Sequence, residues 1–156
     1  MSTSENQSQN PASSKEIGYV ERFEKERGDW TQLIKDIAAK FRVVENMVEV
    51  QVDLYSQRQI AVDYMQQLNV LQSKLKKAHL TEWKAAYEKS GTNEDYRYTE
   101  KERIRIADEK TGPTKIKIDI LQIHVEFFRE TIKTIDNMIF GVKHRLEIED
   151  FKRGNK

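Results

Sequence analysis

The sequence predicts an all-α protein whose long, heptad-patterned helices form an oligomeric helical assembly. Three observations lead to this prediction: apolar residues recur at alternating spacings of four and three, turn-forming residues are scarce, and charged residues are abundant. Of the 156 residues, 37% are hydrophobic and 34% are charged, with only 6 glycines and 2 prolines. A heptad seam buries roughly two positions in seven, so long helices suit a chain that is poor in core material.

The totals also exclude several kinds of protein. The chain has no cysteine, which rules out a disulfide framework, a cysteine-based zinc site and a thiol nucleophile. No apolar run approaches the ~18 residues of a membrane span, and the polar N-terminus lacks the apolar core of a secretory signal. The net charge of +1 does not indicate nucleic acid, so any DNA-binding site must come from local clustering.

The N-terminal part divides into a tail and a helical segment. Residues 1–16 are polar and predict a disordered tail, with or without a role in binding a partner, because they cannot bury enough apolar surface to offset chain entropy. Residues 17–53 predict helices: a short one over 17–27, a break at Gly28, and an N-cap at Asp29 for the next. The seam of that next helix consists of Trp30, Ile34, Ile37, Phe41, Val44 and Val48.

The middle of the chain predicts a second long helix. Residues 48–54 alternate as a strand would, but an isolated short strand has no neighbour, so a helix is the better interpretation. The next seam is in a different frame, which predicts a bend or a change of packing partner near residues 50–58. Gly91 suits the left-handed conformation that ends many helices. The seam of this helix consists of Tyr64, Leu68, Leu71, Leu75 and Ala78.

The last helix has the most regular pattern. Thr111-Gly112-Pro113 predicts a break, and Pro113 fits the first turn of a helix. Before it, residues 90–98 predict a loop, and residues 99–110 predict a short helix or an extended arm. A second apolar stripe (Ile120, Phe127, Met138 and Phe140) indicates a bundle or an oligomer of more than two helices. The predicted oligomerisation seam consists of Leu121, Val125, Phe128, Ile132, Ile135, Ile139, Val142 and Leu146.

Motifs that would indicate an enzyme are missing from the sequence. His79, His124 and His144 do not have the spacing of metal ligands on one helix face. The chain contains no glycine-rich phosphate loop of the Walker type and no serine in a nucleophile elbow. We therefore expect a protein that is not an enzyme and that has no metal and no cofactor.

A stretch of basic and aromatic residues is the candidate DNA-binding site. Residues 74–89 contain five lysines against two glutamates, and Trp83 and Tyr87 lie four residues apart on one helix face. Cations neutralise phosphates and aromatic rings stack on bases, as single-strand binding requires. The alternative is that both rings pack in a helix interface beside a solvated lysine face. The candidate residues are Lys74, Lys76, Lys77, Trp83, Lys84, Tyr87, Lys89, Arg97, Lys101, Arg103 and Arg105.

Short motifs in the rest of the chain match the pattern of a known family. Phe140-Gly141-Val142-Lys143-His144 is followed by Phe151 and Gly154, and this order resembles the C-terminal end of the UvsY family of phage recombination mediators. Leu54-Tyr55-Ser56 and the helix end at Ser90-Gly91 recur at nearly matching separation. The resemblance covers about residues 54–156 and implies a helical core there, with a basic loop region over residues 90–113.

The resemblance implies a function and a set of partners. UvsY-like proteins form ring-like homo-oligomers, bind single-stranded DNA without catalysis, and help a RecA-like recombinase replace a single-strand-binding protein in the bacterial cytoplasm. Their DNA-binding motif corresponds to residues 83–89, where Lys84 and Tyr87 match in character but the family's paired Lys-x-Arg does not recur. DNA contacts are therefore expected within residues 74–105. The alternative is a coiled-coil structural or adaptor protein, such as a phage assembly factor, that does not bind DNA.

Overall fold

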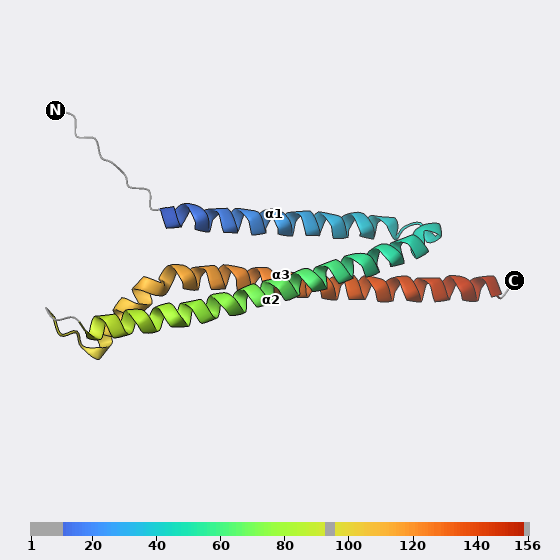
Figure 1. Cartoon of the computed structure of the whole chain (residues 1–156). Helices are drawn as coiled ribbons and strands as arrows, with labels where there is room; N and C mark the ends of the chain where they lie inside the picture. The colour runs from blue at the N-terminus through green and yellow to red at the C-terminus, as the bar shows by residue number, and fades with distance from the viewer. Residues whose placement is uncertain (1–10, 93–95, 155–156) are drawn as a thin grey trace, which may run out of the picture.

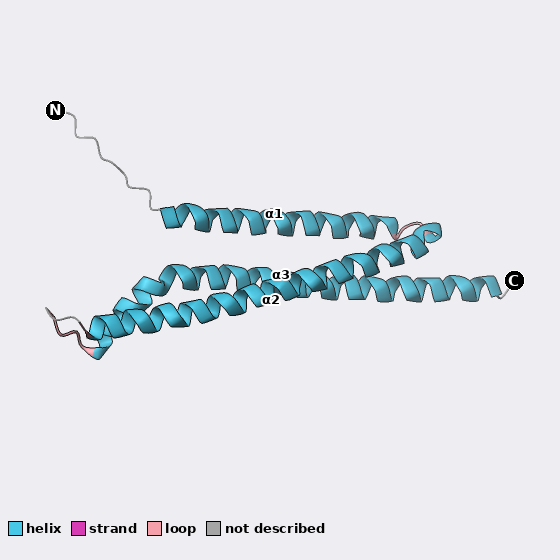
Figure 2. Ribbon diagram, in the orientation of Figure 1, coloured by secondary structure: helices cyan, strands magenta, loops and turns pink. Residues whose placement is uncertain are grey.

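Three long helices make up most of the structure. The computed structural model describes residues 11–92 and 96–154, with side chains from residue 18 onward (Figures 1 and 2). The described residues contain no strand, so the predicted all-α class is confirmed. The helices are α1 (Pro11–Lys40), the short 3-10 helix η1 (Val44–Asn46), α2 (Met47–Gly91) and α3 (Glu100–Gly154).

α2 and α3 form a long antiparallel hairpin, and α1 lies beside it (Figure 1). Side-chain contacts between α2 and α3 show the register, because the sequence separation of the two partners decreases toward the connecting loop. The register contacts are Arg58 with Asp136, Gln72 with Gln122, and Trp83 with Asp108.

None of the described helices contains an apolar stretch that could span a membrane.

α1 is one continuous helix, so the predicted break at Gly28 is wrong, and Asp29 lies inside the helix rather than at an N-cap. Phe23 and Ile37, on either side of the glycine, are both buried against the hairpin. This packing outweighs the roughly 1 kcal/mol that a glycine costs inside a helix. The structure also places residues 11–16 in α1 rather than in the predicted tail, and residues 1–10 lie outside the described residues.

The turn between α1 and α2 comes earlier than the predicted bend at residues 50–58. α1 ends at Lys40, and the chain reverses through η1 before α2 begins at Met47. Residues 48–54 are helical, as predicted. Arg145 of α3 donates to the carbonyl oxygen of Phe41 at 2.6 Å and so joins the turn to the third helix.

Two apolar clusters hold the helices together. The first lies near the α1–α2 turn, and the second lies midway along the hairpin. Their buried members are Ile37, Met47, Val50, Leu54, Ile135, Ile139 and Val142 in the first, and Phe23, Ala61, Leu68, Leu121, Val125 and Phe128 in the second.

The predicted oligomerisation seam lies largely inside a single chain. Leu121, Val125, Phe128, Ile135, Ile139 and Val142 are buried, and Ile132 and Leu146 are half-buried. They pack in the two clusters with residues of α1 and α2. Contacts between copies of the chain stay a prediction, but these six buried side chains are already used within one copy.

α3 continues through Gly112 and Pro113, so the predicted break there is wrong and the predicted helix over residues 99–110 is its first part. Proline removes one backbone donor and kinks a helix, and the hydroxyl of Thr111 donates to the Ala107 carbonyl at 2.9 Å, a bond that also favours bending. Figure 1 shows the resulting bend in this part of α3.

A polar cluster joins all three helices inside the second apolar region. The Tyr64 hydroxyl donates to Glu26 Oε2 at 2.6 Å, and His124 Nε2 lies 3.0 Å from the same oxygen. Phe23 stacks on the fully buried His124 ring, with centroids 4.0 Å apart. Burial, helped by the bond to Glu26, raises the pKa of Tyr64 to about 12. Burial lowers the pKa of His124, although the carboxylate of Glu26 opposes that shift.

Candidate nucleic-acid interface

The free end of the α2–α3 hairpin carries most of the predicted site. We call residues 83–92 and 96–114 the hairpin tip, and Figure 1 shows that the hairpin extends past the start of α1 there. The residues buried between the two helices at the tip are small. Small residues let helix backbones approach closely, so longer polar side chains lie along the two edges of the seam. The buried residues are Ala86, Ser90, Ala107 and Thr111.

A capping box fixes the start of α3. The backbone N–H and the hydroxyl of Thr99 both donate to Glu102 Oε2, at 2.8 and 2.9 Å, while the Glu102 N–H donates back to the Thr99 hydroxyl at 3.3 Å. The two bonds from Thr99 lower the pKa of Glu102, and the bond from its backbone N–H has the larger effect. Threonine followed three residues later by glutamate is a sequence signal for a helix start, and it distinguishes the helix from the extended arm at this position.

The two predicted aromatic residues pack on one edge of the tip. The rings of Trp83 and Tyr87 stack with centroids 5.3 Å apart, and Trp83 Nε1 donates to Asp108 at 2.7 Å. The Arg103 guanidinium lies over the Tyr87 ring, 4.0 Å from its centroid, and donates to the Tyr87 carbonyl at 3.1 Å. Both rings and Arg103 are half-buried, so their main contacts are with each other and with α3.

α2 ends at Gly91, but not for the reason that the sequence suggests. The described glycines have no positive φ angle, so Gly91 does not adopt the left-handed conformation. A Cβ atom at this position would lie 2.5 Å from Nη2 of Arg103. Gly91 therefore leaves room for the guanidinium to reach the end of α2.

The predicted lysines and the remaining arginines are exposed. Lys76 donates to Gln72 at 3.3 Å, and Arg105 lies 3.7 Å from Glu109, whereas several of the other lysines make no ion pair with a described residue. Elsewhere in the chain, some basic side chains, such as Arg58, pair with carboxylates of another helix, and others, such as Lys35, are exposed. The tip therefore differs from the rest of the surface in placing exposed lysines beside aromatic residues. The exposed predicted residues are Lys74, Lys76, Lys77, Lys84, Lys89, Arg97, Lys101 and Arg105.

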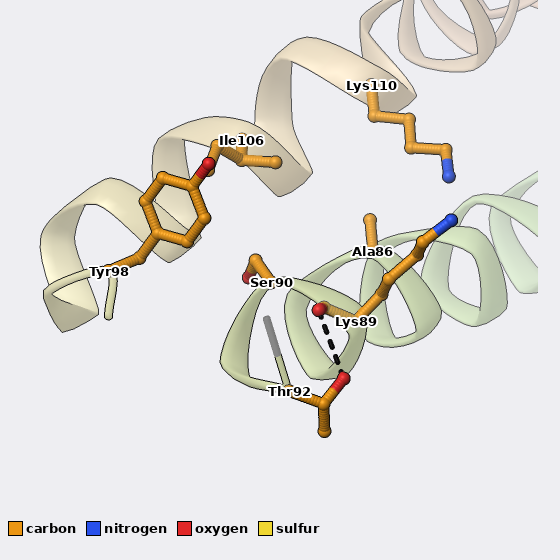
Figure 3. Close-up of a pocket in the computed structure, with 7 residues that line it drawn as sticks. All are labelled: Ala86, Lys89, Ser90, Thr92, Tyr98, Ile106 and Lys110. Atoms are coloured by element: carbon orange, nitrogen blue, oxygen red, sulfur yellow. Dashed lines mark hydrogen bonds between the residues drawn. The ribbon is translucent and has the colours of Figure 1, made fainter. Parts of the chain in front are cut away.

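The opposite edge of the tip contains a groove with a volume of about 380 Å³. Figure 3 shows Lys89 of α2 and Lys110 of α3 directing their amino groups toward the same end of the groove, with Tyr98 at the other end. We call this cavity the tip groove. Its lining residues are Ala86, Lys89, Ser90, Thr92, Tyr98, Ile106 and Lys110.

Lys110 is the groove residue that the sequence interpretation missed. It lies outside the predicted contact region of residues 74–105, and 21 positions separate it from Lys89. The antiparallel register brings the two together, because residues at similar distances from the connecting loop face each other. A prediction that two antiparallel helices are joined by a loop over residues 92–99 would have placed Lys110 opposite Lys89.

The fold and the tip define an all-α binding protein with a basic and aromatic surface at one end of a helical hairpin. The family described as "Recombination, repair and ssDNA binding protein UvsY" matches residues 42–155, which include η1, α2 and α3. The chain belongs to this family, as its C-terminal motifs predicted, and the family's functions are recombination, repair and single-stranded DNA binding. No curated protein and no solved structure matches the chain.

Proposed function

We propose that this protein is a recombination mediator that binds single-stranded DNA at the hairpin tip and helps a RecA-like recombinase replace a single-strand-binding protein there. The observation that carries the proposal is that the family match spans the helical hairpin whose tip presents exposed lysines that make no ion pair with a described residue. Lysines neutralise phosphates one at a time, without any chemical step on the DNA. The protein acts as a binding partner and not as an enzyme.

Self-association strengthens this function. The chain has a net charge of +1, so one copy holds DNA weakly, and an assembly that repeats the tip gains affinity because each added contact is effectively intramolecular. The C-terminal end of α3 offers a surface for the assembly, since Phe140 and Phe151 are 74% and 72% exposed. Both belong to the family motif, and their spacing places them on one face of the helix.

DNA binding is tested by fluorescence anisotropy of a labelled oligo-dT strand at low and high salt, together with the molar mass of the protein in solution. We expect an oligomer whose affinity falls steeply with salt, because each neutralised phosphate releases a counterion. The double variant Lys77→Ala and Lys84→Ala should weaken binding while the molar mass stays unchanged. The control, Lys25→Ala with Lys35→Ala, removes the same charge from exposed positions of α1 and should bind as the wild type does.

The mediator step is tested with a RecA-like recombinase on single strands that are coated with a single-strand-binding protein. The DNA-dependent ATPase of the recombinase should start after a shorter lag when this protein is added. The double variant Lys77→Ala and Lys84→Ala should not shorten the lag. A protein that binds DNA but leaves the lag unchanged is a DNA-binding member of the family without the mediator role.

A helical adaptor that does not bind DNA is the second candidate. The packing of Trp83 and Tyr87 against α3 favours it, because stacked and half-buried rings offer less surface to bases. The same anisotropy experiment decides between the two functions. An oligomer that does not retain the oligo-dT strand at low salt would establish the adaptor and exclude the mediator.

A further inference from the structure

We propose that the tip groove binds one backbone phosphate of single-stranded DNA between Lys89 and Lys110, with the adjoining nucleoside against Tyr98 and Ile106. The inference rests on the proposed function and assigns it a specific subsite. It adds a contact from α3, Lys110, to a surface that the sequence pattern placed mainly on α2.

The two lysines are arranged to share an anion. They project from two antiparallel helices toward the same end of the groove, as Figure 3 shows, and neither makes an ion pair with a described residue. Two like charges that converge repel each other, and an anion between them adds two attractions that offset this repulsion. An ammonium group binds a phosphate oxygen as a point charge, which suits a phosphodiester with only two free oxygens.

The rest of the groove is suited to the neutral part of a nucleotide. The Ser90 and Thr92 hydroxyls already donate to the carbonyls of Tyr87 and Lys89, at 2.7 and 3.2 Å. Ala86, Ile106 and the half-buried Tyr98 ring supply the apolar walls. A base that packs on an aromatic ring gains roughly 1–3 kcal/mol. The volume of about 380 Å³ lies within the range of small-ligand sites, roughly 300–1,000 Å³.

Neighbouring cavities lack this charge arrangement. A cavity on the Trp83 edge is lined by Asp108 and Asp119 as well as by Lys115. In a cavity at the start of α3, Glu102 and Asp108 offset the charges of Lys101 and Arg105. Carboxylates at those positions repel a phosphate. Among its described lining residues the tip groove has two lysines and no acidic residue, so it is the cavity of the three that favours a phosphodiester.

The experiment measures oligo-dT affinity against salt for Lys89→Gln, Lys110→Gln and the double variant of the full-length chain. Each single variant should weaken binding roughly three- to tenfold at low salt. Because both amines hold one phosphate, the double variant should be little weaker than either single one. Its slope of log affinity against log salt should fall by about 0.7, the value for one phosphate of a single strand, rather than by twice that amount.

The matched control is Lys35→Gln, which removes an exposed charge from α1, outside the hairpin. It should bind as the wild type does, and circular dichroism should show the same melting temperature for all variants. If the wild type binds oligo-dT and both single variants bind it with the same affinity, the tip groove is not a phosphate site, and the proposed function still stands. An absence of wild-type binding overturns both.

A second arm tests the nucleoside contact. Tyr98→Leu should weaken binding to oligo-dT about threefold or more, while binding to an abasic strand of equal length stays unchanged, because only the base packs on the ring. Tyr98→Phe keeps the ring and should bind both strands as the wild type does. Equal losses on the two strands would contradict a base contact at Tyr98.

A third arm asks whether the phosphate belongs to a strand or is free. Inorganic phosphate or thymidine monophosphate, added at constant ionic strength, should not displace oligo-dT when its concentration matches the phosphates of the strand. A neighbouring phosphate on the strand is held close by the chain itself, and a free ion is not. Displacement by the free ion from the wild type, but not from Lys110→Gln, would overturn the assignment to DNA and make the groove a site for free phosphate.

Discussion

The guanidinium of Arg103 lies 4.0 Å from the centroid of the Tyr87 ring and donates to the carbonyl of the same residue. This contact joins the first turn of α3 to the last turns of α2, across the loop of the hairpin. Gly91 leaves the space that the guanidinium occupies. The geometry of the tip therefore depends on a residue that the sequence pattern assigned to DNA.

Arg103→Ala should lower the free energy of unfolding by roughly 1–2 kcal/mol, because a cation–π contact and a charged hydrogen bond are both lost. Arg103→Lys should recover little of this loss, since an ammonium group lacks the planar face that stacks on the ring. The measurement is urea unfolding followed by circular dichroism.

A double-mutant cycle with Gly91→Ala tests the same contact. In the wild-type background the new Cβ would meet the guanidinium, so Gly91→Ala should displace Arg103 and destabilise the chain. In the Arg103→Ala background that clash is gone, and the better helix propensity of alanine should make the same change neutral or stabilising. Equal effects in the two backgrounds would show that Arg103 does not occupy this position.

Ile135→Ala should cost roughly 2–5 kcal/mol of unfolding free energy, because Ile135 is fully buried in the first apolar cluster. Ile135→Asp should leave the chain largely unfolded, since it also buries an unpaired charge. The control on the same helix is Ile123→Ala, where the side chain is 60% exposed and the loss should be much smaller. Urea unfolding measures all three variants, and a folded Ile135→Asp chain would contradict the position of this core.

The seams show what spacing can and cannot predict. The four–three spacing of the last helix predicted six buried positions, because the same face of a helix is apolar whatever covers it. The pattern does not say whether the cover is another helix of the same chain or a second copy. Here the cover is α1 and α2, and residues such as Phe140 stay exposed in the single chain.

The residues predicted to interrupt helices and the two groove lysines both depend on tertiary packing that local sequence does not encode. Gly28, Gly112 and Pro113 are local signals worth about 1–3 kcal/mol each, and the packing of two long helices outweighs them. Lys89 and Lys110 are distant in sequence, so only the register of the hairpin brings them together. The lysine-rich part of α2 and the basic residues up to Arg105 were predicted as a binding surface, whereas the contribution of Lys110 depended on a fold that local patterns do not fix.

Gly28→Ala should raise the free energy of unfolding by roughly 0.5–1 kcal/mol, because alanine is a better helix former. Gly28 is exposed inside α1, and a Cβ atom there would meet no atom within 4 Å. The melting temperature should rise by a few degrees at most. Gly28→Pro is the opposing control, since proline inside a helix is strongly unfavourable, and a Gly28→Ala chain that melts earlier would contradict a continuous α1.

The polar cluster should make stability fall in mild acid. The folded chain favours neutral His124, because burial lowers its pKa and outweighs the opposing effect of Glu26, while Arg22 and Arg27 act in the same direction as burial. The unfolded chain therefore takes up a proton below about pH 6.5 that the folded chain does not bind. This contribution to stability is present above that pH and is lost as the pH falls toward the lowered pKa of His124.

A second loss follows in stronger acid. Burial of Glu26 alone would raise its pKa, but hydrogen bonds from Tyr64, Arg22 and His124 outweigh it and lower the pKa overall. The charged carboxylate thus contributes stability above its ordinary pKa of 4.5, and that contribution disappears as the pH falls through the lowered value. The two effects have the same sign and act in different pH ranges.

The variant that separates them is His124→Phe. Phenylalanine keeps the stacking on Phe23, removes the buried Nδ1 that has no hydrogen-bond partner, and does not titrate. Between about pH 7.5 and about pH 5.5, its unfolding free energy should decline less than that of the wild type, while the loss below about pH 4.5 persists. His144→Gln removes an exposed histidine and should keep the wild-type decline. Urea unfolding at each pH measures both, and an equal decline in the wild type and in His124→Phe would show that His124 does not cause the loss in mild acid.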